Sequence, residues 1–501
     1  MRPFIATSLG VACTAALTLP LVLPAGANAT GAALPATAAS QRRSVSDDPA
    51  ASRSAPAAPP DGIPGATHSL PLVRLAASGR AASGAVRGLP ARKVAPFSLV
   101  GVVWKDPYEE LRGRVQVRTR ATGTGTWSGW QEVQAHDDDA PDPGAEELRG
   151  RTVRGGTAPL WVGDSDAVQL RVTPERAGRR APAPLPEGLR LELVDPGRSD
   201  ADGETAGQEG AGPRASGQEG QESAGQEHAP AARRASPAPY ESQESQRPGE
   251  SPDPEAAASS AVNAQLAQLG AAVIPALDKP ASEGDLAAAD DEGRGPDARR
   301  HVGPRPRIVT RAGWGADEKL REKDFAYTKT VRAAFVHHSA TGNNYRCAQA
   351  PSVVRGIYRY HVRSSGWRDL GYNFLVDKCG TIYEGRAGGV AKPVMGAHTL
   401  GFNTDSMGVA VLGSFGRANP TRSAVDALAR LTAWKLGLYG ADPSGTTYLV
   451  SGGGNKFKKG RKVRMRVIAG HRDGFTTECP GRRLYRKLGA ARTAAARLQG
   501  R

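Results

Sequence analysis

Long apolar runs are scarce in this chain of 501 residues, and the one that stands out extends from Phe4 to Leu23. It follows Met1-Arg2 and precedes Ala27-Asn28-Ala29, which has the small-x-small pattern of a cleavage site. We therefore interpret residues 1–29 as a secretory signal peptide. A retained membrane anchor is the alternative, because Pro20 lies in the run and little charge precedes it. No later stretch approaches the length of a membrane span, so we expect a secreted or wall-associated protein without stable membrane insertion.

Cysteine is equally scarce. Of the four cysteines, Cys13 lies within the predicted signal peptide, so Cys347, Cys379 and Cys479 remain. An odd number of thiols in an oxidising compartment needs an explanation. If Cys479 binds a metal, Cys347 and Cys379 are left to pair. A disulfide that closes a loop of that size would contribute about 3–4 kcal/mol to stability by restricting the unfolded chain.

Acidic residues are few in the C-terminal part of the chain. Residues 301–501 contain 35 Lys and Arg against 12 Asp and Glu, a formal charge of +23, whereas the rest of the chain has 31 against 38, or −7. Such a positive field predicts a polyanionic partner. Nucleic acid and an anionic cell wall or membrane surface both fit by charge, and export argues against nucleic acid.

The length predicts two or three domains. Hydrophobic residues make up 39% of the chain, enough for a core, but 61 Gly and 38 Pro indicate that much of it does not fold. Residues 30–67 form a flexible leader rich in Ala, Pro and Ser, and residues 197–304 form an acidic-leaning linker in which Gly-Gln-Glu recurs. Neither segment could bury enough apolar surface to offset its chain entropy. Residues 262–277 are more apolar, and a short helix could form there.

Residues 68–196 have the pattern of a small all-β sandwich. Short runs that suit strands are separated by turn residues; they lie at 97–104, 114–118, 127–133, 160–162, 167–172 and 189–194. Four of the seven tryptophans are found here: Trp104, Trp127, Trp130 and Trp161. Their rings could stack on sugars in a wall-binding module or pack in the core.

Residues 305–501 predict an α/β domain with one central mixed sheet flanked by helices. The expected strands are apolar runs at 331–338 and 407–412 and a hairpin that joins 371–376 to 381–386. Helical periodicity predicts helices over 352–361, with His361 packed on the apolar face, over about 425–438, and over 483–498. The basic run 456–466 should be an exposed loop or hairpin, because so many like charges could not be buried.

Two segments of this domain carry candidate metal ligands. Val467–Gly481 is a short strand followed by a loop, with His471 and Cys479 eight positions apart. Ala333–Ala340 is another apolar strand that ends in histidine. Two imidazoles, one thiolate and one open position are typical of a catalytic rather than a structural zinc site. The alternative from spacing alone is a core histidine, a solvated histidine and a spare thiol.

Several motifs, taken together and in this order, resemble the zinc-dependent N-acetylmuramoyl-L-alanine amidases of the peptidoglycan recognition protein family. The resemblance covers about residues 306–490 and rests on Val336–Ala340, Gly366–Phe374, Tyr383–Arg386, Gly396–His398, Phe402-Asn403 to Gly408, Gly470–Arg472 and Thr477–Gly481. The β module also resembles those that precede this domain in exported bacterial members.

The resemblance implies a role for individual residues. His337, His471 and Cys479 match the zinc ligands, so Zn²⁺ is the expected cofactor. Tyr372 matches the tyrosine that orients water or stabilises the oxyanion, and Thr477 occupies a catalytic position. Ala410 stands where some members have a glutamate base, which puts proton transfer by that route in question. The residues that match the substrate-binding groove are His338, Trp367, Arg386, His398 and Asn403.

The expected activity is hydrolysis of the amide between N-acetylmuramic acid and L-alanine of the peptidoglycan stem. A bound zinc lowers the pKa of water to about 7 and polarises the carbonyl. Peptidoglycan and its anionic wall polymers also suit a domain of charge +23. We expect a monomer. Two alternatives are a recognition protein that binds peptidoglycan without turnover and a basic protein with a closed four-ligand zinc site; the matching motifs offer no fourth ligand.

Overall fold

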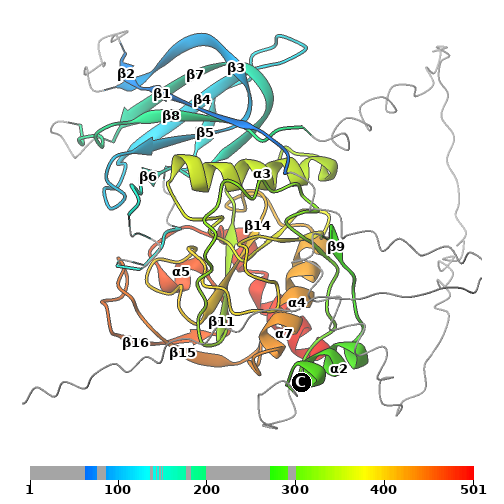
Figure 1. Ribbon diagram of the computed structural model, residues 1–501. Helices are drawn as coiled ribbons and strands as arrows, with labels where there is room; N and C mark the ends of the chain where they lie inside the picture. Colours follow the sequence, from blue (N-terminus) through cyan, green and yellow to red (C-terminus); the bar gives the residue numbers. More distant parts are fainter. Residues whose placement is uncertain are drawn as a thin grey trace, which may run out of the picture. The chain divides into compact units, whose positions relative to one another are not determined.

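The structure is a computed structural model that describes residues 62–75, 86–135, 139–142, 144–145, 148, 150–175, 182–198, 271–290 and 301–501 (Figure 1). All of these residues belong to one compact unit, Ala58–Arg501. The predicted signal peptide, most of the predicted leader and most of the predicted linker lie outside the described residues. None of the described helices is both long and apolar enough to cross a membrane.

The N-terminal module is the predicted β-sandwich. Its strands are β1 (Ala66–Pro71), β2 (Val73–Arg74), β3 (Arg87–Trp104), β4 (Gly113–Ala121), β5 (Gln131–Val133), β6 (Gly155–Gly156), β7 (Leu160–Pro174) and β8 (Arg190–Asp195). The main order is β1-β8-β3-β7-β4-β5, and the strands of this module pair antiparallel. The pairing of β3 with β7 contains register shifts between residues 89 and 99 of β3. Such bulges bend long strands, so one hydrogen-bonded sheet folds over its own core.

The four tryptophans of this module divide into two pairs. Trp104 and Trp161 are buried, so these two serve packing. Trp127 and Trp130 are half-buried, and the Arg118 guanidinium lies 5.2 and 5.3 Å from their ring centroids. An arginine over an aromatic face is a stabilising cation–π contact.

The C-terminal domain has the predicted mixed sheet, with strand order β17-β11-β14-β12-β13-β10-β9. Its strands are β9 (Val273–Ile274), β10 (Ile308–Val309), β11 (Ala333–His338), β12 (Phe374–Val376), β13 (Ile382–Glu384), β14 (Ser406–Val411) and β17 (Ile468–Gly470). The centre is parallel, since β11 pairs in parallel with both β14 and β17. All six residues of β11 and of β14 are buried, as expected of parallel strands covered on both faces. The β12–β13 hairpin is confirmed as an antiparallel pair.

Helices pack against this sheet (Figure 1). They are α2 (Lys279–Asp290), η4 (Cys347–Gln349), α3 (Ala350–Arg359), η5 (Tyr360–Ser364), α4 (Arg422–Gly437), α5 (His471–Gly474), α6 (Arg482–Tyr485) and α7 (Leu488–Leu498). The α4 helix is confirmed, and Thr421 caps it by accepting a hydrogen bond from the Ala424 amide at 3.2 Å. The predicted last helix is wrong in one respect, because it is divided into α6 and α7. Leu484 and Leu488, on either side of the break, are buried in the same core.

The folded domain begins earlier than the sequence predicts. Residues 271–290 fall within the predicted linker, yet β9 pairs antiparallel with β10 at the sheet edge. Ile274 and Leu286 join the main hydrophobic core, and Arg305 pairs with Asp285 at 3.2 Å. Helix α2 begins at Lys279, beyond the apolar residues 262–277 for which the sequence allows a short helix. A two-residue strand has no periodicity to detect, so only tertiary contacts reveal this extension.

The two domains share a hydrophobic core. Leu99, Val103 and Val194 of the N-terminal module pack in one cluster with Val354 and Ile357 of α3. The hydroxyl of Tyr360 donates to the Thr157 carbonyl at 2.9 Å. The module and the domain therefore share an apolar contact within the same compact unit.

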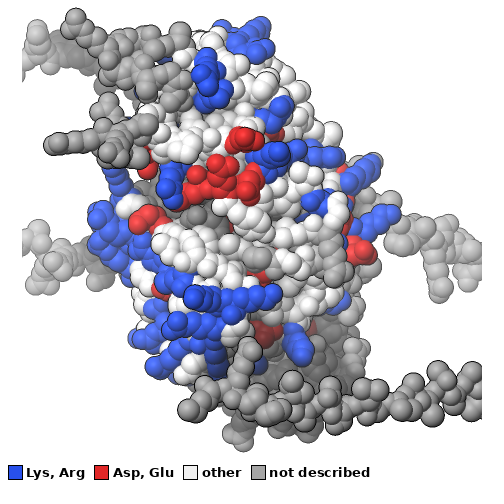
Figure 2. All heavy atoms as spheres, turned by 90° about the vertical axis from the view of Figure 1, so that its left-hand side faces the viewer, with Lys and Arg blue, Asp and Glu red and all other residues white. Residues whose placement is uncertain are grey.

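A basic hairpin lies at the surface of the C-terminal domain. It consists of β15 (Thr446–Val450) and β16 (Lys462–Arg466), which pair antiparallel, as the sequence predicts for this basic run. Figure 2 shows Lys and Arg side chains gathered on the lower part of the face it presents. The exposed basic residues of the hairpin are Lys456, Lys458, Lys459, Arg461, Lys462, Arg464 and Arg466.

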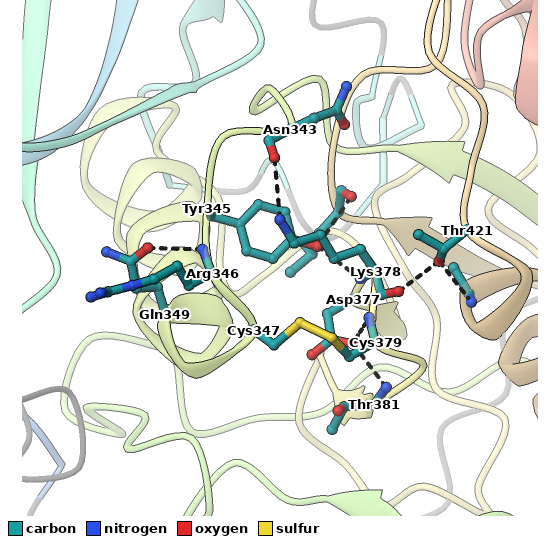
Figure 3. Close-up of a disulfide and its surroundings, with 12 residues drawn as sticks. Asn343, Tyr345, Arg346, Cys347, Gln349, Asp377, Lys378, Cys379, Thr381 and Thr421 are labelled. Carbon is teal, nitrogen blue, oxygen red and sulfur yellow. Dashed lines mark hydrogen bonds between the residues drawn. A yellow bond between two sulfur atoms is a disulfide. The ribbon is translucent and has the colours of Figure 1, made fainter. Parts of the chain in front are cut away.

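Cys347 and Cys379 form a disulfide that links the start of η4 to the β12–β13 turn (Figure 3). The turn itself is held by Asp377, whose Oδ1 accepts from the amides of Cys379 and Thr381, both at 2.9 Å. The bond therefore joins a helix to a hairpin that is already well ordered.

Replacing Cys347 and Cys379 together by alanine should lower the free energy of unfolding by about 3–4 kcal/mol, because the cross-link closes a loop of sequence separation 32 in the unfolded chain. Urea unfolding of the double variant beside the parent measures this loss. If the double variant has the same free energy of unfolding as the oxidised parent, the disulfide contributes nothing to stability.

Candidate metal centre

The sheet register brings two histidines together. In the parallel pair β11–β17, Val336 lies opposite Gly470, so the next residues along each strand are His337 and His471. Their ring centroids are 4.4 Å apart. Both side chains lie at the carboxyl ends of parallel strands, where open α/β sheets place their ligands.

Cys479 reaches the same point from the loop after α5. Its Sγ lies 3.8 Å from His337 Nδ1 and accepts a hydrogen bond from the His338 amide at 3.4 Å. The ligand atoms of His337, His471 and Cys479 all lie within 4.8 Å of one another. The loop is held in place because the Arg472 amide donates to the Cys479 carbonyl at 3.1 Å, and the Cys479 amide donates to Thr477 Oγ1 at 3.0 Å.

The donor set fits a zinc ion. His337, His471 and Cys479 are 0%, 1% and 5% exposed, and neither ring nitrogen of His471 makes a hydrogen bond within the described residues. A buried imidazole without hydrogen bonds is costly unless another group, such as a metal, satisfies it. Burial also lowers the pKa of His337 to about 3 and that of His471 well below its usual range, so both rings are neutral as metal ligation requires.

A second hydrogen-bonding partner orients His337. Thr399 Oγ1 lies 3.3 Å from its Nε2, so that Nδ1 is left to face Cys479. Ligating histidines almost always use their other nitrogen in this way. Thr399 is not among the site residues that the sequence predicts, although it directly follows the Gly396–His398 motif, a signal that could reveal it.

Tyr372 lies beside these ligands. Its ring centroid is 5.4 Å from that of His337, and its side chain is 3% exposed. The preceding residue is anchored, because the Gly371 amide donates to Nδ1 of the buried His361 at 3.1 Å. The Tyr372 hydroxyl donates a short hydrogen bond to Asp139 Oδ2.

Asp139 belongs to the N-terminal module, in the connection between β5 and β6. Its Oδ1 lies 2.9 Å from His337 Nδ1 and 3.4 Å from His471 Nδ1. The Asp139 carboxylate is therefore within hydrogen-bonding distance of one candidate ligand and close to a second, while the three-residue cluster itself consists of His337, His471 and Cys479.

Comparison with known protein families finds matches for two parts of the chain. Residues 327–482 match the N-acetylmuramoyl-L-alanine amidase family. The C-terminal domain is a member of that family. Residues 42–189 match another family, the Rv3811 N-terminal galactose-binding domain-like domains.

The curated relatives of the amidase-family domain are distant. Peptidoglycan-recognition protein SC2 of Drosophila simulans is 28% identical over 183 residues, which are 36% of this chain and 84% of that protein. Peptidoglycan-recognition protein LE of Drosophila melanogaster is 32% identical over 181 residues, 36% of this chain and 45% of that protein. Among solved structures, Drosophila PGRP-LB is 26% identical, with a TM-score of 0.29 over 36% of this chain and 92% of that one.

The residues predicted to bind substrate do not all lie alike in the amidase-family domain. Arg386 is buried and donates to the carbonyls of Leu370 and Met395, at 2.8 and 3.2 Å, so it supports two loops. Trp367 is buried and its ring centroid is 4.4 Å from that of His361. Both residues therefore support the loop that carries Tyr372.

The other three predicted substrate-binding residues lie closer to the metal ligands. His338 accepts from the Phe415 amide through Nδ1 at 3.3 Å. His398 is fully buried, with its ring edge-on to His337 at 5.4 Å. Asn403 accepts from the amides of His398 and Thr399, at 2.8 and 3.0 Å, which fixes the loop that carries both.

Ala410 leaves one position of the amidase-family site without a carboxylate. It lies opposite His337 in the β11–β14 register and is buried in the core that contains Tyr372. Residues paired across neighbouring strands project to the same face of the sheet. A glutamate there would point toward the metal side, and alanine offers no base from that strand.

Glu384 is a buried carboxyl outside the ligand cluster, on β13. It accepts from the Arg311 amide at 3.1 Å, and burial raises its pKa to about 7. The folded protein therefore holds a proton that the unfolded chain releases at a lower pH. Stability falls as pH rises from about 4.5 through 7, because the unfolded state is then favoured by its easier ionisation.

The Glu384→Gln variant should lose that part of the pH dependence, which is about 3 kcal/mol between pH 5 and pH 8. Glutamine resembles the protonated carboxyl and cannot ionise. The measurement is urea unfolding of parent and variant at both pH values. If the change in the free energy of unfolding between pH 5 and pH 8 is the same in parent and variant, Glu384 ionises normally in the folded state.

Proposed function

We propose that the chain is a zinc-dependent N-acetylmuramoyl-L-alanine amidase that hydrolyses the bond between the lactyl group of N-acetylmuramic acid and L-alanine of the stem peptide. The observation that carries this proposal is the cluster of His337, His471 and Cys479 beside Tyr372 in a domain of the amidase family. Two imidazoles and one thiolate are three protein ligands, the number found in catalytic rather than structural zinc sites.

The residues of the chain take separate parts in this reaction. A zinc ion in the cluster supplies a Lewis acid and lowers the pKa of water. His337 is oriented by Thr399, and Cys479 by the amides that hold its loop. Tyr372 carries a hydroxyl that can donate to the oxyanion as it develops on the amide carbonyl, a contact of the kind worth about 3–4 kcal/mol.

Export to the cell wall is part of the proposal. The disulfide between Cys347 and Cys379 suits an oxidising compartment, and the predicted signal peptide suits secretion. The exposed basic hairpin β15–β16 offers a surface for anionic wall polymers, which attract such charges over a range of about 8–10 Å. We propose that the enzyme acts as a monomer.

Recognition of peptidoglycan without hydrolysis is the second candidate. Ala410 favours it, because the site has no base from β14. The names of the curated relatives describe recognition, and the solved PGRP-LE structure is a complex with tracheal cytotoxin, a monomeric diaminopimelic acid-type peptidoglycan.

Mass spectrometry of digested peptidoglycan decides between the two. Purified peptidoglycan is incubated with the zinc-loaded full chain and with the variant Asp139→Ala, which lacks the carboxylate beside His337 and His471. Each protein is tested with and without a chelator. We expect intact stem peptides with a free alanine amine, and their loss when the metal is removed. Binding of both proteins to peptidoglycan without release of peptides would favour recognition.

A further inference from the structure

Residues Asp139–Asp142, which we call the closing segment, enter the metal centre from the other domain. Asp139 is 6% exposed, and its two carboxylate oxygens lie against His337, His471 and Tyr372. His337 and His471 are proposed metal ligands, and Tyr372 is the proposed oxyanion donor. A carboxylate of the chain itself thus contacts the side chains with which water and substrate are proposed to interact.

The rest of the closing segment is held by residues near the same site. Asn403 Nδ2 donates to the Ala140 carbonyl at 2.9 Å and to Asp142 Oδ1 at 2.8 Å. The Gly401 amide donates to the same Asp142 oxygen at 2.6 Å. Asn403 is one of the residues expected to bind substrate, and here its amide is bonded to the closing segment.

The described residues that follow the closing segment contact the amidase-family domain as well. Farther along the same connection, Arg151 pairs with Glu322 at 2.6 Å and donates to the Trp367 carbonyl at 2.5 Å. The Arg154 amide donates to the Ser365 carbonyl at 3.0 Å. Together with the shared core under α3, these contacts join the N-terminal module to the amidase-family domain near the site.

We propose that Asp139 is the fourth ligand of the metal, and that the closing segment keeps the site shut in the resting protein. A carboxylate oxygen is an ordinary zinc ligand, and Asp139 Oδ1 already lies 2.9 and 3.4 Å from two of the ligand nitrogens. Because the carboxylate is tethered, it competes with water and substrate at an effective concentration of about the mM range or higher. This inference rests on the proposed function, and it explains how a catalytic ligand set can lie buried.

Ligand access to the metal tests the proposal without measuring hydrolysis. The full chain is loaded with Co²⁺ in place of zinc, because the visible spectrum of Co²⁺ reports its ligands, and is titrated with azide. We expect azide to shift the spectrum of Asp139→Ala at concentrations at least about 10-fold below those that shift the spectrum of the parent. Azide binding to the parent and the variant with equal affinity would overturn the proposal.

Three further variants make the result specific. Asp142→Ala removes the Gly401 and Asn403 contacts but keeps the Asp139 carboxylate, so azide affinity should lie between those of parent and Asp139→Ala. Glu132→Ala removes an exposed carboxylate of the same module, paired with Arg114, and should behave as the parent. Asp139→Asn keeps the size of the side chain but is a poorer ligand, and should also open the site, which separates loss of ligation from loss of folding.

Hydrolysis gives the second readout. Asp139→Ala should release stem peptides about 10-fold faster than the parent or more, because the open fraction of the sites rises. If Asp139→Ala hydrolyses more slowly while it retains metal, the proposal is overturned. Asp139 would then be the general base that the position of Ala410 does not supply. If neither protein hydrolyses peptidoglycan, the proposed function fails, and the azide titration still decides whether Asp139 is a ligand.

Discussion

Replacing Cys479 by alanine should abolish tight zinc binding and lower hydrolysis of peptidoglycan by about 10³-fold or more. The thiolate is one of three ligands in the cluster, and the metal supplies several kcal/mol of transition-state stabilisation. Metal content after dialysis and the rate of peptide release measure the two effects. The rates are best compared between Asp139→Ala and the double variant Asp139→Ala/Cys479→Ala, because the closing segment then limits neither rate.

The neighbouring Thr476→Ala variant is the matched control, because Thr476 is exposed and in the same loop. It should keep both zinc and activity. Full hydrolysis by Cys479→Ala would remove Cys479 from the ligand set and, with it, the argument for the metal centre.

Replacing Tyr372 by phenylalanine should lower kcat by about 10²–10³-fold and leave zinc binding intact. Only the hydroxyl is lost, and a single donor to an oxyanion is worth about that much. The Tyr372 hydroxyl also donates to Asp139 in the resting structure, so its removal could loosen the closing segment as well. Kinetics in both the parent and the Asp139→Ala background separate the two roles.

If Tyr372 stabilises the oxyanion, the loss of kcat persists in the Asp139→Ala background, where its resting partner is gone. Tyr448→Phe, on the exposed face of β15, is the control for removal of a hydroxyl and should change neither parameter. An unchanged kcat in Tyr372→Phe would show that the hydroxyl only holds the closing segment.

Much of the C-terminal domain follows from local patterns. Strands β11 and β14 are continuous apolar runs, and such runs are typical of buried parallel strands. The β12–β13 hairpin has a turn with Gly380 and an Asp377 that accepts two amides of the turn. The candidate ligands were also visible, because two histidines that follow apolar strands and a cysteine in the loop after one of them are a rare combination.

Other features had no local signal. Strand β9 has two residues and pairs only because β10 leaves an open edge. Arg386, expected to bind substrate, is turned instead toward two backbone carbonyls, and sequence cannot tell which way a loop residue points. Asp139 follows two other aspartates, Asp137 and Asp138, and nothing in its surroundings in the sequence distinguishes it.

The sequence by itself determined the sheet and the types of ligand, since both depend on residues close together in the chain: continuous apolar runs, turn residues, a histidine at the end of a strand and a cysteine in a nearby loop. Only the tertiary structure decided how the site is completed. Tyr372 and Asp139 are 233 residues apart and belong to different domains. Their contact depends on the shared core that packs α3 against β3 and β8, and long-range packing of this kind leaves no periodic trace in either segment.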